Sequence, residues 1–279
     1  MNKRSWMMLR VFINHYNPKA NNAFTQLLPQ QERQAFLLED IHSSDLTPIL
    51  QPPINALQPI HYSWISEALK QLPKPLYPIA VSSLTVAQMD GLKFKNPVPV
   101  SPAIQAFLQE QLFDLLHFKE HLPREYLPKT ELSPLLNWNK RQILNLIDFL
   151  GLHDLAFEVR HIVNRNYLKN IYKCLTPKEF YYLKVCLHQK NKIVSPKLGL
   201  DPAHVDPKTL KKMLHKRGLS RLGRALYGQP IDLVWHLAHQ LDTGRGHILL
   251  KDYKSEPLPR ITPALKQQVI NLINFLKGE

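Results

Sequence analysis

The stretch "LTPKEFYYL" (residues 175–183) decides the fold class, because it carries the signal for the start of a helix. Thr176 is suited to accept a hydrogen bond from a free N–H of the first helical turn. Pro177 suits the first helical position, where its missing N–H costs nothing. Glu179 follows Thr176 by three residues and completes a capping box. The stretch therefore predicts a helix that begins at Pro177.

The same start signal recurs along the chain. Proline outnumbers glycine 23 to 9, and a capping residue precedes proline at Ser101-Pro102, Ser133-Pro134, Asp206-Pro207 and Thr262-Pro263. Apolar residues then recur at helical spacing after most of these starts, as they do after Thr262 at Leu265, Val269, Leu272, Ile273 and Leu276. We expect a mainly α protein, a multi-helix bundle of short helices.

The N-terminal third is less regular and rich in proline. "SWISEALKQLP" (63–73) predicts a helix capped by Ser63, whereas the alternation in "MLRVFIN" (8–14) suggests a short strand or an extended arm. Proline clusters at 95–102 and 120–134 indicate linkers. We therefore expect residues 1–133 to form an N-terminal region of short helices and linkers, and residues 134–279 to form a helical C-terminal domain.

Composition points to a basic protein of a reducing compartment. The formal net charge is +14, which favours anionic partners such as nucleic acid, an anionic membrane surface or acidic protein. The only cysteines are Cys174 and Cys186, with no C-x-x-C pair, so neither a disulfide framework nor a zinc ribbon is indicated. Arg10 and Asn14 interrupt the first apolar run, so we expect no signal peptide.

The densest positive charge lies in "DPKTLKKMLHKRGLSRLGRALYG" (206–228). We interpret it as two short helices, the first ended by Gly218. The basic residues are Lys208, Lys211, Lys212 and Lys216 on the first helix and Arg221 and Arg224 on the second. This pattern is compatible with helix-turn-helix DNA binding, with a basic docking surface, or with a solvated face.

The stretch "HQLDTGRGH" (239–247) contains Asp242-Thr243-Gly244, the local signature of an aspartic-protease loop. Such an enzyme needs two carboxylates on loops that follow strands. Here the apolar residues before Asp242 have helical spacing, and Gly244 suits a left-handed helix cap. We expect a structural turn at the end of a helix.

Two arrangements of histidines have spacings that could hold a metal ion. The expected helix before Asp242 places Asp232, His236, His239 and Gln240 on its polar face, and His117 and His121 form a second helical pair. Neither set has the H-E-x-x-H spacing, so we expect solvated or partner-facing surfaces.

Catalytic motifs are lacking elsewhere too. Cys186 and His188 would point to different helix faces, and no phosphate-binding loop or nucleophile elbow occurs. We expect no enzymatic activity, cofactor, metal or small-molecule substrate.

Several stretches together resemble the SctK family, the accessory component of the cytosolic sorting platform of bacterial type III secretion injectisomes. "FINHYNPKA" (12–20) and "HYSWISEALKQLPKPL" (61–76) are similar to its N-terminal patterns. Residues 145–186 resemble its paired central helices with a Leu-Gly-Leu turn between them. Residues 217–246 resemble its C-terminal helices, which end in Leu-Asp-x-Gly-Arg-Gly.

The resemblance implies an all-helical adaptor without catalysis, cytoplasmic and peripheral at the inner-membrane base of the apparatus. Its partners would be the cytosolic domain of the inner-membrane ring, the pod protein and the stator protein, with only indirect membrane contact. Tryptophan and arginine are common interface hot spots, so we expect docking through Trp64, Trp235, Arg221, Arg224 and Arg245 and the four lysines of 208–216. The alternative is that both tryptophans are core residues, and Trp235, which lies on an apolar stripe, fits the core better than the surface. The alternative function is a basic helical nucleic-acid-binding protein.

Overall fold

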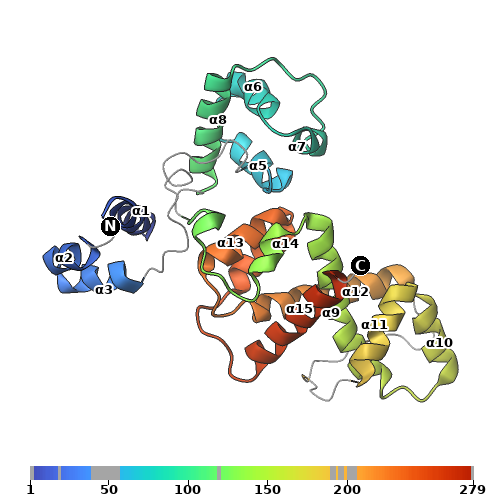
Figure 1. Ribbon diagram of the computed structural model, residues 1–279. Coiled ribbons are helices and arrows are strands. Elements are labelled where there is room, and N and C mark those ends of the chain that lie inside the picture. Colours follow the sequence, from blue (N-terminus) through green and yellow to red (C-terminus); the bar gives the residue numbers. More distant parts are fainter. Residues whose placement is uncertain are drawn as a thin grey trace. The chain divides into compact units, whose positions relative to one another are not determined.

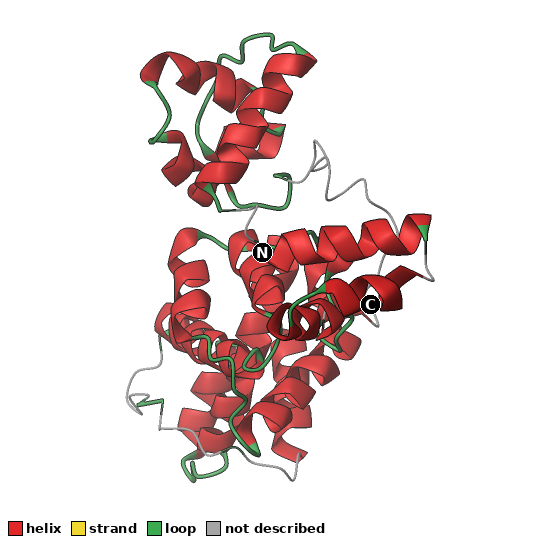
Figure 2. Ribbon diagram, turned by 90° about the vertical axis from the view of Figure 1, so that its left-hand side faces the viewer, coloured by secondary structure: helices red, strands yellow, loops and turns green. Residues whose placement is uncertain are grey.

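The computed structural model describes residues 3–17, 20–38, 57–117, 121–188, 193, 198–199 and 206–277. Within these ranges the chain forms helices and loops and no strand (Figure 2). The prediction of a mainly α, multi-helix fold is confirmed. The packing divides the chain into two compact units, Met1–Thr130 with Pro230–Gly246, and Glu131–Gln229 with His247–Glu279. The return of residues 230–246 to the first unit was not predicted.

The first unit opens with three helices that share a small apolar core. They are α1 (Lys3–Tyr16), α2 (Ala20–Leu27) and α3 (Gln30–Leu38). Met7 and Val11, four residues apart on α1, are buried, and Trp6 meets the Phe36 ring edge-on. The strand or extended arm expected at residues 8–14 is therefore wrong, because the buried positions follow the helical repeat rather than the alternation. Pro18 and Lys19 of the family-like stretch lie outside the described residues.

The rest of the first unit is built from short helices around buried polar anchors. They are α5 (Tyr62–Leu69), α6 (Tyr77–Ser82), α7 (Val86–Gly91), α8 (Pro102–Leu115) and α13 (Ile231–Gln240), with 3-10 turns at Lys74–Leu76 and Arg124–Tyr126. The buried Gln88 side chain donates to the carbonyls of Leu57 and Ile60 at 2.7 and 2.9 Å. Ser101 caps α8 as predicted. The cap of α5 is His61 rather than Ser63.

The second unit is a helical bundle. Its helices are α9 (Lys140–Val159), α10 (Arg165–Lys173), α11 (Pro177–His188), α12 (Pro207–Ala225) and α15 (Ile261–Lys277), preceded by a 3-10 turn at Ser133–Asn137. The unit boundary between residues 246 and 247 falls inside α14 (Thr243–Asp252).

Its helix starts test the capping predictions. The capping box of Thr176 and Glu179 is confirmed, and so is the Asp206 cap of α12. Ser133 begins a 3-10 turn without a side-chain cap. Thr262 lies inside α15 rather than before it; its hydroxyl accepts from Leu258 N–H and donates to the Arg224 carbonyl.

Helices α9, α12 and α15 pack on one another (Figure 1), and α9 and α12 meet at two glycines. A Cβ atom on Gly218 would overlap the carbonyl oxygen of Ile147, and one on Gly151 would overlap the carbonyl oxygen of Leu214. The two backbones therefore touch without side chains between them. Both glycines lie within continuous helices, so the predicted helix end at Gly218 and the Leu-Gly-Leu turn at Gly151 are wrong.

Polar pairs flank this glycine contact on both sides. His215 bonds to Asp148 at 2.6 Å, and Arg221 Nε donates to Asp154 at 2.9 Å. In each pair the partners are 67 positions apart, and the same offset relates Gly151 to Gly218. Since the pairs advance together along both helices, α9 and α12 run in the same direction.

We expect Gly218→Ala to lower the free energy of unfolding by about 1–3 kcal/mol or more, because the added methyl group forces two backbones apart. Urea denaturation followed by circular dichroism measures the change.

Gly223→Ala is the matched control in the same helix. Its Cβ would meet only Leu249 Cδ2, at 3.6 Å, so we expect a gain of about 0.5–1 kcal/mol from helix propensity. Equal stability of the two variants would contradict the close contact.

Candidate functional site

Exposed basic residues of α12 lie along one ridge of the helix. Lys208, Lys212, Lys216 and Arg224 share the four-residue repeat of one helix ridge, with Ser220 in the remaining place, and all five are exposed. Lys211 is exposed beside them. At 1.5 Å per residue the ridge extends about 24 Å. We call Lys208, Lys211, Lys212, Lys216, Ser220 and Arg224 together the α12 ridge.

Arg221 does not belong to this surface, contrary to our expectation. Its side chain is 7% exposed and Asp154 beside it is 4% exposed. The guanidinium donates to Asp154 of α9 through Nε and Nη2, and to Gln268 Oε1 of α15 at 2.8 Å. A planar guanidinium suits such divided bonding. Arg221 therefore joins three helices, and its docking role is wrong because the side chain is not accessible.

Trp64 and Trp235 are buried in the first unit, at 7% and 5% exposure. The His239 ring stacks between them, with centroids 4.2 Å from Trp64 and 3.8 Å from Trp235, and His121 stacks on Trp235 at 4.8 Å. Trp64 Nε1 donates to the Leu241 carbonyl at 2.9 Å. The core alternative is thus the observed one for both tryptophans, and neither side chain is accessible for the docking expected of it.

The expected polar face of α13 is also buried. Asp232, His236, His239 and Gln240 are at most 5% exposed, so the prediction of a solvated or partner-facing surface is wrong. Asp232 accepts from His121 at 2.9 Å, His236 Nε2 donates to the Leu122 carbonyl at 2.8 Å, and His239 Nδ1 donates to the Trp235 carbonyl at 2.8 Å. Burial lowers the pKa of His236 to about 3, so the ring is neutral at pH 7.

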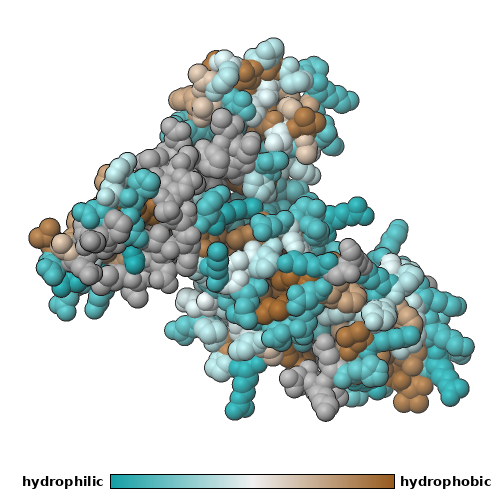
Figure 3. Space-filling view, in the orientation of Figure 1, coloured by the Kyte–Doolittle hydropathy of each residue, from teal (hydrophilic) through white to brown (hydrophobic). Residues whose placement is uncertain are grey.

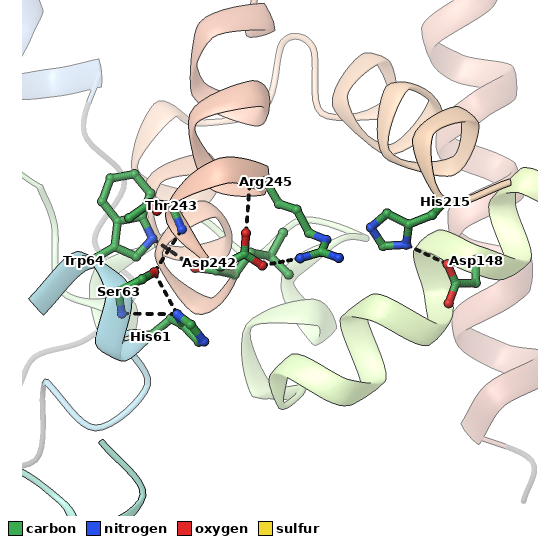
Figure 4. A network of polar contacts seen from close by, with 9 residues as sticks. His61, Ser63, Trp64, Asp148, His215, Asp242, Thr243 and Arg245 are labelled. Atoms are coloured by element: carbon green, nitrogen blue, oxygen red, sulfur yellow. Dashed lines mark hydrogen bonds and ion pairs between the residues drawn. The ribbon is translucent and has the colours of Figure 1, made fainter. Parts of the chain in front are cut away.

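Asp242 begins a helix and does not follow a strand (Figure 4). Its carboxylate accepts from Arg245 N–H at 3.2 Å and pairs with the Arg245 guanidinium, while Ser63 Oγ accepts from Thr243 N–H at 3.0 Å. The "DTG" stretch therefore follows α13 and starts α14, and it does not lie on a loop that follows a strand. Gly244 lies in the first turn of α14 rather than at the end of α13. Arg245 is half-buried and ion-paired, which limits it as a docking residue.

Other reactive groups are not assembled into a site in the part of the chain that the structure describes. No group of three potential metal ligands occurs there. Residues 118–120, between His117 and His121, lie outside the described residues. Cys186 is buried, and burial raises the pKa of its thiol to about 12, which keeps it protonated.

One face of the second unit is mainly hydrophilic. On the face shown in Figure 3, teal residues predominate over α9–α12 and α15, and hydrophobic residues lie in small groups between them. None of the described helices has the length and apolar character needed to cross a bilayer.

Removing one partner of the Arg221–Asp154 pair should destabilise the second unit strongly. Arg221→Met leaves the Asp154 carboxylate buried and uncompensated, so we expect a loss of about 3–5 kcal/mol. The double variant Arg221→Met, Asp154→Leu should recover most of it in the same urea titration. A double variant no more stable than the single one would mean that the pair does not act as a unit.

Stability should also fall in acid because of His153. Burial first, and then the charge of Arg221, lowers the pKa of this side chain to about 3. Between pH 6.5 and about 3 the unfolded chain binds a proton that the folded chain does not, so the free energy of unfolding decreases as pH falls through this window.

We expect His153→Gln to make this decrease shallower, by up to about 1.4 kcal/mol per pH unit, in urea titrations at pH 4 to 7. His188→Gln, at an exposed position, is the control and should follow the parent. An unchanged slope for His153→Gln would show that His153 titrates normally in the fold.

Comparisons of the chain with protein-family models, with curated proteins and with solved structures find no match.

Proposed function

We propose that the chain is a non-enzymatic adaptor of the type III secretion sorting platform, acting in the cytoplasm at the inner-membrane base of the apparatus. It would link the cytosolic domain of the inner-membrane ring to the pod protein, with the stator protein as a further partner. The resemblance of four stretches to the SctK family supports the secretion context. The observation that carries the docking role is the α12 ridge, a row of exposed cations on a helix whose other side is fixed in the bundle.

The chemistry of the ridge favours an acidic protein surface. No ion pair joins Lys211, Lys212, Lys216 or Arg224 to any carboxylate that the structure describes. Such a row of cations raises the association rate with an acidic partner and fixes its register. Trp64, Trp235 and Arg221 stabilise the fold instead, so the docking role rests on the lysines and Arg224.

Nucleic-acid binding is the second candidate, favoured by the same ridge through its charge alone. The helix-turn-helix expected within residues 206–228 does not form, because Pro207–Ala225 is one continuous helix, α12. The experiment below separates the two functions.

We expect a quadruple change of the ridge lysines (Lys208, Lys211, Lys212 and Lys216 to Gln) to reduce partner recovery without unfolding the chain. Exposed substitutions typically change stability by less than about 0.5 kcal/mol each. The tagged full chain is purified from mildly lysed cells, with and without nuclease, and bound proteins are identified by mass spectrometry. Ring, pod or stator proteins should be recovered regardless of nuclease.

The control changes the same number of exposed lysines elsewhere: Lys95, Lys169, Lys173 and Lys277. This control should retain the partners. Recovery only of nucleic-acid-associated proteins that disappear with nuclease would refute the adaptor and support the second candidate.

A further inference from the structure

The α12 ridge ends in a groove of the second unit with a volume of about 360 Å³. The groove lies between the C-terminal half of α12, the end of α14 and the segment that follows α14. Ser220 and Arg224, the last positions of the ridge, line it. The exposed charge of α12 therefore leads directly to a hollow large enough for part of a ligand.

The groove has an apolar floor. Leu219, Tyr227 and Leu249 are buried residues that line it, and Ile248 beside them is 45% exposed. An exposed isoleucine next to a hollow offers apolar area that a partner side chain can cover.

Gly223 keeps this floor open. A Cβ atom there would meet only Leu249 Cδ2, at the ordinary contact distance of 3.6 Å. The glycine is therefore not required by helix packing, unlike Gly218 in the same helix, and it weakens the helix by about 0.5–1 kcal/mol relative to alanine. The absence of a side chain at Gly223 leaves space in the groove above the helix backbone.

The rim is positively charged beyond what the local structure needs. Arg224, Lys251 and Lys254 stand against one carboxylate, Asp252. Both α12 and α14 end here, and each helix end contributes about half a unit of negative charge. The three cations therefore exceed the negative charge of Asp252 and the two helix ends by about one unit charge.

We propose that this groove binds an acidic peptide segment of a protein partner. An apolar side chain of the segment inserts over Gly223 against Leu219 and Leu249, and flanking carboxylates bond to Arg224, Lys251 and Lys254. The proposal rests on the adaptor function. It specifies the groove as the site where a partner attracted by the ridge is bound. An acidic peptide fits better than nucleic acid, because an apolar floor with one carboxylate on its rim suits an alternation of apolar and acidic side chains.

Photo-cross-linking from the rim tests the proposal in the full chain. p-Benzoylphenylalanine replaces Ile248, the cells are irradiated, and the cross-linked peptides are sequenced by mass spectrometry. We expect a defined protein segment with Asp or Glu flanking an apolar residue. Gly223→Leu, which fills the floor, should reduce its yield by about tenfold or more, and Arg224→Glu should do the same through the rim. Gly223→Ala should leave it nearly unchanged.

Two outcomes would overturn the groove assignment: cross-links to nucleic acid or to segments without acidic residues, or a yield that neither Gly223→Leu nor Arg224→Glu lowers. Circular dichroism of each variant confirms that it is folded, and Arg224→Glu, at an exposed position, keeps the test valid if Gly223→Leu fails to fold. Platform proteins that co-purify with the chain when position 223 is still glycine, while no acidic segment cross-links from position 248, would leave the adaptor standing and remove only the groove.

Discussion

The second unit depends on the backbone contact between α9 and α12 at Gly151 and Gly218. At this point neither helix has a side chain, so the carbonyls of Ile147 and Leu214 occupy the space where Cβ atoms would lie. Close-packed interiors transmit such constraints because they contain little free volume. The positions of the residues one turn before and after the glycines are therefore fixed as well.

Polar pairs on both sides of the contact join the same two helices. On the more exposed side, Asp148 and His215 are 43% and 21% exposed. On the buried side, Arg221 and Asp154 satisfy each other and extend the link to Gln268 of α15. A buried ion pair adds little net stability compared with apolar packing, but it tolerates few alternative registers. The register of α9 against α12 therefore has two determinants, one steric and one electrostatic.

Local signals in the sequence predicted the caps at Ser101, Thr176 and Asp206 correctly. The caps expected at Ser63, Ser133 and Thr262 were wrong. Long-range packing explains most of the other errors. The caps at Thr176, Ser101 and Asp206 depend on residues within one turn, so the sequence shows them directly. Gly218 was interpreted as a helix end because a glycine usually signals a break, and the family resemblance implied a turn at Gly151; only the partner helix reveals that each glycine allows a close contact. The polar residues of α13 and Arg221 were expected at the surface for the same reason, since their buried partners are distant in the chain.

The candidate docking features show the same contrast between local and long-range determinants. Lysines 208 to 216 were predicted correctly as one helix face, because exposure of a charged row follows from amphipathic spacing alone. The groove at Gly223 was missed, since its other wall comes from residues 248–254 and nothing in the α12 sequence indicates them.

The ridge and the groove would contribute different terms to binding. Charges in solvent are screened beyond about 8 Å at physiological ionic strength, so the ridge lysines act mainly on the rate of encounter and on orientation. Affinity needs area removed from water, at about 25 cal/mol per Å² of apolar surface, and the floor beside Gly223 is where the ridge meets such area. A surface with only the ridge would bind many polyanions weakly. The proposed apolar hollow at one end of the ridge would allow discrimination between an acidic protein segment and other polyanions.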